Sequence, residues 1–325
     1  MPQPAAGDRH VNSLLTNLSL LSMQESKDFV APQVCPFIKV MKQSDRYVQY
    51  TDAFFRRNTM AKRARGTESA GGGWEVDTTP NYHCDTWGLH VDIHDDDRRN
   101  SDAVFDDDAD ATEYLSQQAM VNMEVQFATE IFATSIWTGS TTGSDITPGT
   151  TWNASAGKPV QDVRTQGSSI KKKTGQWPNV LVCGYNAWNA IRDNADVLDR
   201  IKHTQRGVVT EDIVAQVMGL DRVVVSGAIQ TTSAEGAATE TTAFINTLDD
   251  ALLLYVPDVP GKRTPSACYT FVWTGAEAGG RNEVGARMKK FRVEELASDR
   301  VEMDQNFDIK QTGATFGVYF DDVVT

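Results

Sequence analysis

The fold is decided by residues 178–227, which begin Pro178-Asn179-Val180-Leu181-Val182-Cys183-Gly184 and end Asp221-Arg222-Val223-Val224-Val225-Ser226-Gly227. Both quoted segments contain a short apolar run, and the first run ends at a glycine. Runs of this length and composition are typical of buried strands. The stretch therefore predicts one buried strand near its start and a second near its end.

Two helical patterns separate the predicted strands. Ala187, Trp188 and Ile191 fall at helical spacing after the first strand. A second helix opens at Thr210 and Asp212, has four apolar positions on one face and closes at Gly219. This strand–helix–helix–strand unit carries no nucleophile, phosphate loop or metal-ligand cluster, so we interpret it as architectural.

The order of residues in this unit resembles a known family. The segments PNVLVCG, WNAIRDNADVLDRIK and GLDRVVVSGA, in that order within residues 178–228, are similar to the corresponding part of tailed-bacteriophage major capsid proteins with the Hong Kong 97 fold. The resemblance extends over nearly the whole chain. It implies an α+β capsid fold with an N-terminal arm, an extended E-loop hairpin, a long spine helix, a peripheral domain and an axial domain.

The resemblance also implies a division of the chain. The expected parts are an N-terminal arm (1–40), an E-loop hairpin (41–97), the spine helix with the peripheral domain (98–174), an axial domain (175–285) and return strands of the peripheral domain (286–325).

Length and charge narrow the class of protein. A chain of 325 residues exceeds the usual size of one domain, so two or three lobes are expected. The formal net charge of -13 argues against a dedicated nucleic-acid binder, which needs clustered cations. No apolar run reaches about eighteen residues and no signal-peptide pattern is present, so we expect a soluble chain made in a cytoplasm. Four widely spaced cysteines predict buried thiols: Cys35, Cys84, Cys183 and Cys268.

The N-terminal region predicts an arm. Val11, Leu14, Leu15, Leu18 and Leu21 mark one stripe of a short amphipathic helix. Residues 29–36 contain two prolines, which predict an extended path. An apolar helix ahead of the core can lie across a neighbouring subunit, so Leu14, Leu15 and Leu18 are candidate inter-subunit contacts.

The next region predicts a long hairpin. Residues 37–50 and 82–93 alternate as strands do, and a basic, glycine-ended segment joins them. The resemblance makes this hairpin the E-loop, which reaches over an adjacent subunit; the alternative is an ordinary surface hairpin with a solvated tip. Five cations at the tip are candidate contacts with acidic residues 95–97 or 106–108 of a neighbour: Arg56, Arg57, Lys62, Arg63 and Arg65. Lys62 could also donate to a covalent crosslink, but the sequence identifies no partner for it.

The longest helical pattern follows the acidic run at 95–110. Carboxylates before a helix complement its macrodipole, and the pattern continues to about Ser135 over roughly 24 residues. The family places its spine helix here. Residues 139–158 and 230–242 predict loops, residues 251–257 and 267–273 predict strands, and the tail from Phe291 predicts strands of the peripheral sheet.

Two patterns in the sequence are candidates for metal binding. His83, His90 and His94 beside Asp95 could suggest a metal site, but the segment alternates as a strand, and four strand residues span about 13 Å. We therefore expect a polar strand face. The calcium-loop pattern at residues 106–117 lacks its required Gly and Glu. No cofactor and no catalytic residue is predicted.

Three functions remain open. The resemblance favours a major capsid protein that assembles as pentamers and hexamers into an icosahedral virion head around double-stranded DNA. It implies scaffolding, portal and decoration or minor capsid proteins as further partners, non-specific proximity to DNA, and no membrane. The alternatives are an encapsulin-like shell around a cellular cargo and a metal-dependent enzyme that uses the histidines.

Overall fold

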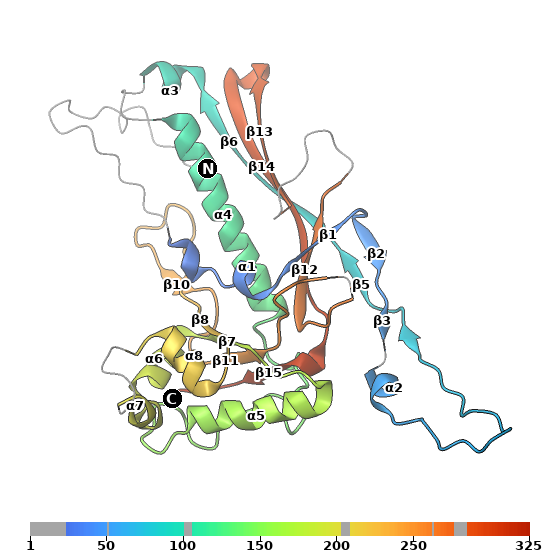
Figure 1. Ribbon diagram of the computed structural model, residues 1–325. Coiled ribbons are helices and arrows are strands. Elements are labelled where there is room, and N and C mark those ends of the chain that lie inside the picture. The colour runs from blue at the N-terminus through green and yellow to red at the C-terminus, as the bar shows by residue number, and fades with distance from the viewer. Residues whose placement is uncertain (1–23, 51, 101–105, 203–208, 262, 276–284) are drawn as a thin grey trace.

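The computed structural model describes residues 24–50, 52–100, 106–202, 209–261, 263–275 and 285–325. Figure 1 shows two lobes and a projecting hairpin. One lobe is a long sheet with helix α4 beside it, and the other is a smaller sheet surrounded by helices α5 to α8. Within the described residues, none of the helices combines the length and apolarity needed to cross a membrane.

The long sheet is built around β14 (Ser298–Gln311). One part of β14 pairs antiparallel with β12 (Cys268–Trp273), and the other part lies between β13 (Ala286–Val293) and β6 (Asp85–His94). At the opposite edge, β1 (Phe37–Val40) pairs parallel with β12. The sheet therefore joins segments from the start, the middle and the end of the chain.

Helix α4 (Asp107–Glu130) is the long helix that the sequence predicted, and its 24 residues match the expected length. It begins earlier than expected because the Asp106 side chain accepts from the Ala109 amide and caps it. It also ends five residues earlier. There the amides of Ile131 and Phe132 both bond to the Phe127 carbonyl, and the Trp137 indole donates to the Ile131 carbonyl.

Both strands and both helices of the predicted strand–helix–helix–strand unit are present, and the structure adds a third helix, α7, between them. Strands β7 (Val180–Cys183) and β8 (Arg222–Val225) pair in parallel, and β7 is buried along its whole length. Between them lie α6 (Tyr185–Asp193), α7 (Ala195–Ile201) and α8 (Glu211–Met218). Gly219 closes α8 with a φ of 77°, in the left-handed region where glycine is favoured.

The second sheet has the order β15-β11-β7-β8, with β11 at Ala251–Leu254 and β15 at Gly317–Phe320. Alternate residues of β7 enter two different cores: Val180 and Val182 face α4, whereas Leu181 and Cys183 face the helices of the second lobe. Helix α5 (Pro159–Thr174) packs in this second core. A sheet buried on both faces explains why its strands are continuous apolar runs.

The hairpin is described by short elements: β2 (Ser44–Arg46), β3 (Gln49–Tyr50), α2 (Asp52–Arg56), β4 (Val76–Asp77) and β5 (Asn81–His83). Helix α3 (Asp95–Asn100) follows β6. The part of the chain that the structure describes also contains three short 3₁₀ segments: η2 (Ser26–Asp28), η3 (Glu294–Leu296) and η4 (Ala314–Phe316).

Three expectations were wrong in part. Residues 29–36 are not wholly extended, since Ala31–Val34 form helix α1 with Pro32 in its first turn, where proline is tolerated. The loop predicted at 230–242 is flanked by β9 (Ile229–Thr231) and β10 (Thr242–Phe244), which pair with each other. The tail does not return wholly to the first sheet, because β15 pairs with the free edge of β11 in the second.

Candidate functional site

The hairpin projects away from both lobes (Figure 1). Its base is a ladder of β2 with β5, followed by a shorter ladder of β3 with β4. Residues 57–75 beyond these ladders contain neither helix nor strand and are exposed throughout. This geometry gives the tip a long reach and little contact with its own subunit.

The five cations predicted at the tip are all exposed. The Arg57 guanidinium lies 5.7 Å from the centre of the Phe54 ring, a cation–π distance. Two large apolar side chains are also presented to solvent, with Met60 92% and Trp74 69% exposed. Cationic and apolar groups together on a projecting segment are typical of an interaction surface.

The acidic runs expected to receive this tip are largely engaged within the subunit. Asp95 accepts from Arg292 at 2.6 Å, and Asp108 accepts from Arg98 at 2.9 Å and from Lys290 at 2.7 Å. Hydrogen bonding to Arg292 lowers the pKa of Asp95 below its usual range. Asp95 and Asp108 therefore already have cationic partners in their own subunit, which argues against the hypothesis that they bind the tip cations of a neighbour.

The arm candidates Leu14, Leu15 and Leu18 lie outside the described residues. The part of the arm that follows, residues 24–35, is termed here the arm anchor. Its Gln24 side chain exchanges two hydrogen bonds with the backbone of Ile229, and the Gly227 amide donates to the Asp28 carbonyl. Residues Val30 and Val34 are fully buried in the core between α4 and the sheets. The arm anchor therefore belongs to the core of its own subunit.

Glu124 is the polar centre of this junction, and sequence reasoning missed it. Its side chain is fully buried on α4. Oε2 accepts from the amides of Val30 at 2.8 Å and Ala31 at 2.9 Å, and Oε1 accepts from Asn246 Nδ2 at 2.5 Å. Burial, opposed by these hydrogen bonds, raises the pKa of Glu124 to about 7. A signal was present, because Glu124 lies at helical spacing with Phe127 and Ile131 on an apolar stripe.

A groove of about 840 Å³ runs beside the base of the hairpin. Its walls carry aromatic side chains of the hairpin and of β12, with Tyr82 stacked on Phe271 at a ring distance of 4.8 Å and Tyr47 at 5.5 Å from the same ring. Residues 263–266 and 312–316 form the opposite side. The groove is a second concave surface next to the projecting tip.

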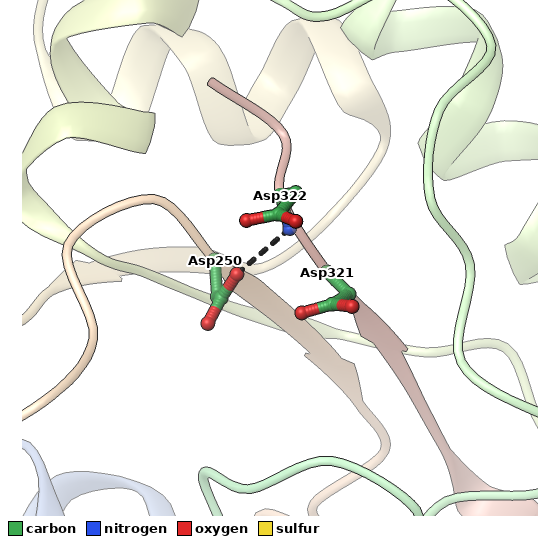
Figure 2. Close-up of side chains that lie close together, drawn as sticks. All are labelled: Asp250, Asp321 and Asp322. Atoms are coloured by element: carbon green, nitrogen blue, oxygen red, sulfur yellow. Dashed lines mark hydrogen bonds between the residues drawn. The ribbon is translucent and has the colours of Figure 1, made fainter. Parts of the chain in front are cut away.

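A carboxylate cluster closes the second sheet (Figure 2). Asp250 precedes β11, and Asp321 and Asp322 follow β15. The Asp322 amide donates to Asp250 Oδ1 at 2.9 Å. The Tyr319 hydroxyl donates to Asp250 Oδ2 at 2.8 Å. Burial and the neighbouring carboxylates raise the pKa of Asp321. Both carboxylate oxygens of Asp250 thus accept from protein donors. We therefore interpret the cluster as structural: it holds the start of β11 to β15 and the residues that follow it.

The histidines lie on strands, as expected. His83 ends β5, while His90 and His94 lie on β6. Each has its own local contact: His83 with Asp85 at 3.4 Å, His90 with Asp92 at 3.9 Å, and His94 with the Leu296 carbonyl at 3.3 Å. The structure does not gather them into one cluster. The four cysteines are free and buried, as predicted.

Comparisons with known proteins agree with the fold. Residues 139–268 match the family model described as phage major capsid protein E. A major capsid protein of Burkholderia phage BcepMu is 21% identical over 227 residues, which cover 68% of this chain and 70% of that protein.

Solved structures resemble the chain over most of its length. A phage-related protein from Bordetella bronchiseptica RB50 has a TM-score of 0.68 at 16% identity, covering 92% of this chain and 94% of that one. The mature capsid of bacteriophage PhiM1 gives 0.62 at 12% identity, covering 97% and 92%. An encapsulin complex from Synechococcus elongatus PCC 7942 gives 0.53 at 12% identity, covering 100% and 98%. Together, the matches confirm the interpretation of the sequence as a tailed-phage major capsid protein with the Hong Kong 97 fold.

Proposed function

We propose that copies of this chain assemble as pentamers and hexamers into an icosahedral head shell that encloses double-stranded viral DNA. The projecting hairpin is the observation that carries the proposal. Its tip exposes cations together with Met60 and Trp74 and makes little contact with its own subunit. A segment of this composition gains burial only from another molecule, and a shell supplies that molecule at every subunit contact.

The inter-subunit contacts we propose are the five tip cations and, on the arm, Leu14, Leu15 and Leu18. The aromatic groove at the hairpin base is a further surface that a neighbour could cover. We retain the predicted arm, E-loop hairpin, spine and peripheral region and axial domain as a proposed division, with β15 assigned to the axial sheet because it pairs with β11.

The remaining features of the proposal follow from a role as a phage shell. The protein acts as a structural component of the virion rather than as an enzyme, and it is synthesised in the host cytoplasm. Scaffolding, portal and decoration or minor capsid proteins are its proposed further partners. The net charge of -13 suits a surface that lies near DNA without gripping it.

Electron microscopy of the full chain, expressed alone and with a scaffolding protein, tests assembly. We expect closed shells with fivefold and sixfold capsomers. A strictly monomeric species at high concentration in both preparations would contradict the proposal.

The contents of particles from the native host distinguish the two shell functions. Packaged DNA supports a viral head. A packaged enzyme would instead favour the encapsulin function, for which the likeness to the Synechococcus complex provides a structural basis.

A further inference from the structure

Two of the four buried cysteines meet where the arm anchor joins the long sheet. Strand β1 pairs parallel with β12 in a register that sets Phe37 opposite Thr270. The Thr270 amide donates to the Pro36 carbonyl at 3.0 Å, and the Thr270 hydroxyl donates to the Cys35 carbonyl at 3.3 Å. Two residues earlier in the same register, Cys35 at the end of the arm anchor lies opposite Cys268 at the start of β12.

The sulfur atoms of this pair lie in one apolar core. Both side chains are fully buried in the core between α4 and the sheets. The Cys268 thiol donates to the Val34 carbonyl at 3.7 Å, and the Cys35 and Cys268 thiols are hydrogen-bonding partners of each other. Neighbouring strands lie about 4.8 Å apart, which is within the range of roughly 4.4–6.8 Å that a disulfide needs between its Cα atoms. The register therefore gives the pair a spacing that a disulfide accepts.

The two sheets keep the other cysteines away from this pair. Alternate residues of β12 face opposite sides of the long sheet: Cys268 faces the core that contains Cys35, whereas Phe271 faces the core that contains Cys84. Cys183 lies on β7 and faces the helices of the second lobe. The structure describes all four cysteines, and Cys35 with Cys268 is the pair that can bond while the fold stays intact.

We propose that Cys35 and Cys268 form a modification site, at which oxidation by a peroxide joins the two sulfur atoms as a disulfide. The bond ties the arm anchor covalently to β12. Reductants of a cytoplasm keep such a pair as thiols, so the bond forms where peroxide is present and these reductants are absent. The site is a property of the single subunit and goes beyond the proposed shell function, which its failure would leave untouched.

The reaction balances with hydrogen peroxide as the oxidant. One thiolate attacks a peroxide oxygen, the O–O bond breaks, and the sulfur becomes a sulfenic acid while the departing hydroxide takes up a proton and leaves as water. The second thiol then attacks this sulfur, the S–O bond breaks, and a second water leaves with the thiol proton. The two sulfur atoms lose two electrons in total, and the peroxide gains them.

Burial makes the first step slow and leaves the second step fast. Burial raises the pKa of Cys35 well above its usual value, so the thiolate that attacks peroxide is rare. The first step therefore needs a transient local opening that admits peroxide. Once one sulfur is oxidised, the other thiol is already beside it. Disulfide formation should then outpace further oxidation to a sulfinic acid.

Mass spectrometry of the full chain tests the site. The reduced protein is incubated with hydrogen peroxide, unfolded, alkylated with N-ethylmaleimide at its remaining thiols and digested without reduction. We expect a peptide containing Cys35 joined to a peptide containing Cys268, two hydrogen atoms lighter than the separate peptides together. Cys84 and Cys183 should carry the alkyl group, and dithiothreitol added before alkylation should restore all four thiols.

The melting temperature and two variants complete the test. Because Cys35 and Cys268 are far apart in sequence, the disulfide restricts the unfolded chain, and the oxidised protein should melt several degrees higher than the reduced protein. Cys268→Ala removes the partner of Cys35 and should abolish both the linked peptide and this rise. Cys183→Ala is the matched control, since it removes an equally buried sulfur from the second lobe and should preserve both.

Three results would overturn the proposal. The first is folded wild type in which Cys35 and Cys268 stay free, or become sulfinic acids, under peroxide that oxidises the thiols of the chain unfolded in urea. The second is a link from either residue to Cys84 or Cys183 at comparable yield in the folded protein. The third is a linked protein that melts no higher than the reduced protein. The wild type alone decides all three if a variant does not fold.

Discussion

Removal of the arm in two lengths separates its two roles. One truncation removes residues 1–23, which contain the candidate contacts Leu14, Leu15 and Leu18. The other removes residues 1–35 and so takes the arm anchor as well. The sequence pattern of the arm predicts that a subunit without residues 1–36 still folds. The structure contradicts that prediction, because the anchor is part of the core.

The magnitude follows from the burial of the anchor. Phe29, Val30 and Val34 are at most 1% exposed. At about 1.5–3 kcal/mol for each fully buried side chain, their loss costs roughly 5–9 kcal/mol, an upper range because unfolded chains already bury some surface. The longer truncation also removes both backbone donors of Glu124. Native proteins are stable by only about 5–15 kcal/mol, so this loss is comparable to the whole.

Thermal unfolding followed by far-UV circular dichroism, with gel filtration of the same samples, measures the outcome. We expect the truncation of residues 1–23 to melt as the full chain does, because it leaves the arm anchor and its buried side chains in place. The truncation of residues 1–35 should melt far lower or fail to yield soluble protein. Equal melting temperatures for the two truncations would refute the assignment of the anchor to the core.

Two further predictions concern the hairpin and the architectural unit. Replacing Arg63 and Arg65 with Glu should lower the yield of shells at low salt, while the melting temperature of the subunit stays unchanged. The defect should shrink as ionic strength rises, because salt screens exposed charges. A normal yield of shells at low salt would show that the tip is only a solvated loop. Gly184→Ala should prevent stable folding, since a Cβ atom there would overlap the backbone carbonyls of Thr247 and Leu248. Soluble expression and a melting temperature equal to those of the wild type would contradict this, because they would show that the backbone can move to make room. Gly71→Ala is the matched control, since a Cβ atom at residue 71 meets no atom within 4 Å.

The elements that sequence patterns predicted well are those decided by local chemistry. The apolar runs of β7 and β8, the left-handed Gly219 after α8 and the length of α4 all follow from neighbouring residues. The end of α4 does not, because it is set by the Trp137 indole, which donates to the Ile131 carbonyl from outside the helix. Likewise, β15 joins the second sheet because β11 offers a free edge, and nothing in residues 317–320 specifies that partner.

The candidate site divides in the same way. The exposure of the tip cations could be predicted, since five cations close together cannot be buried without partners. The role of Glu124 could not be read from its neighbours Met123 and Val125, because its donors lie about 90 residues before it and its third partner about 120 residues after it. The groove could not be predicted from the sequence either, because it forms only where the base of the hairpin lies beside β12, which is far from it in sequence.

The ion pairs of Asp95 and Asp108 bear on what would attract the hairpin tip to a neighbouring subunit. In the proposed shell, a tip with five cations would meet neighbours of strongly negative net charge, but Asp95 and Asp108 are already paired with Arg292, Arg98 and Lys290 in their own subunit. The attraction then comes from the summed field of the neighbouring body rather than from one matched carboxylate. A diffuse attraction depends on the total charge of the tip and little on which cation supplies it. Position-specific binding would have to come instead from Met60 and Trp74, whose exposed apolar surface needs a particular hollow on the neighbour.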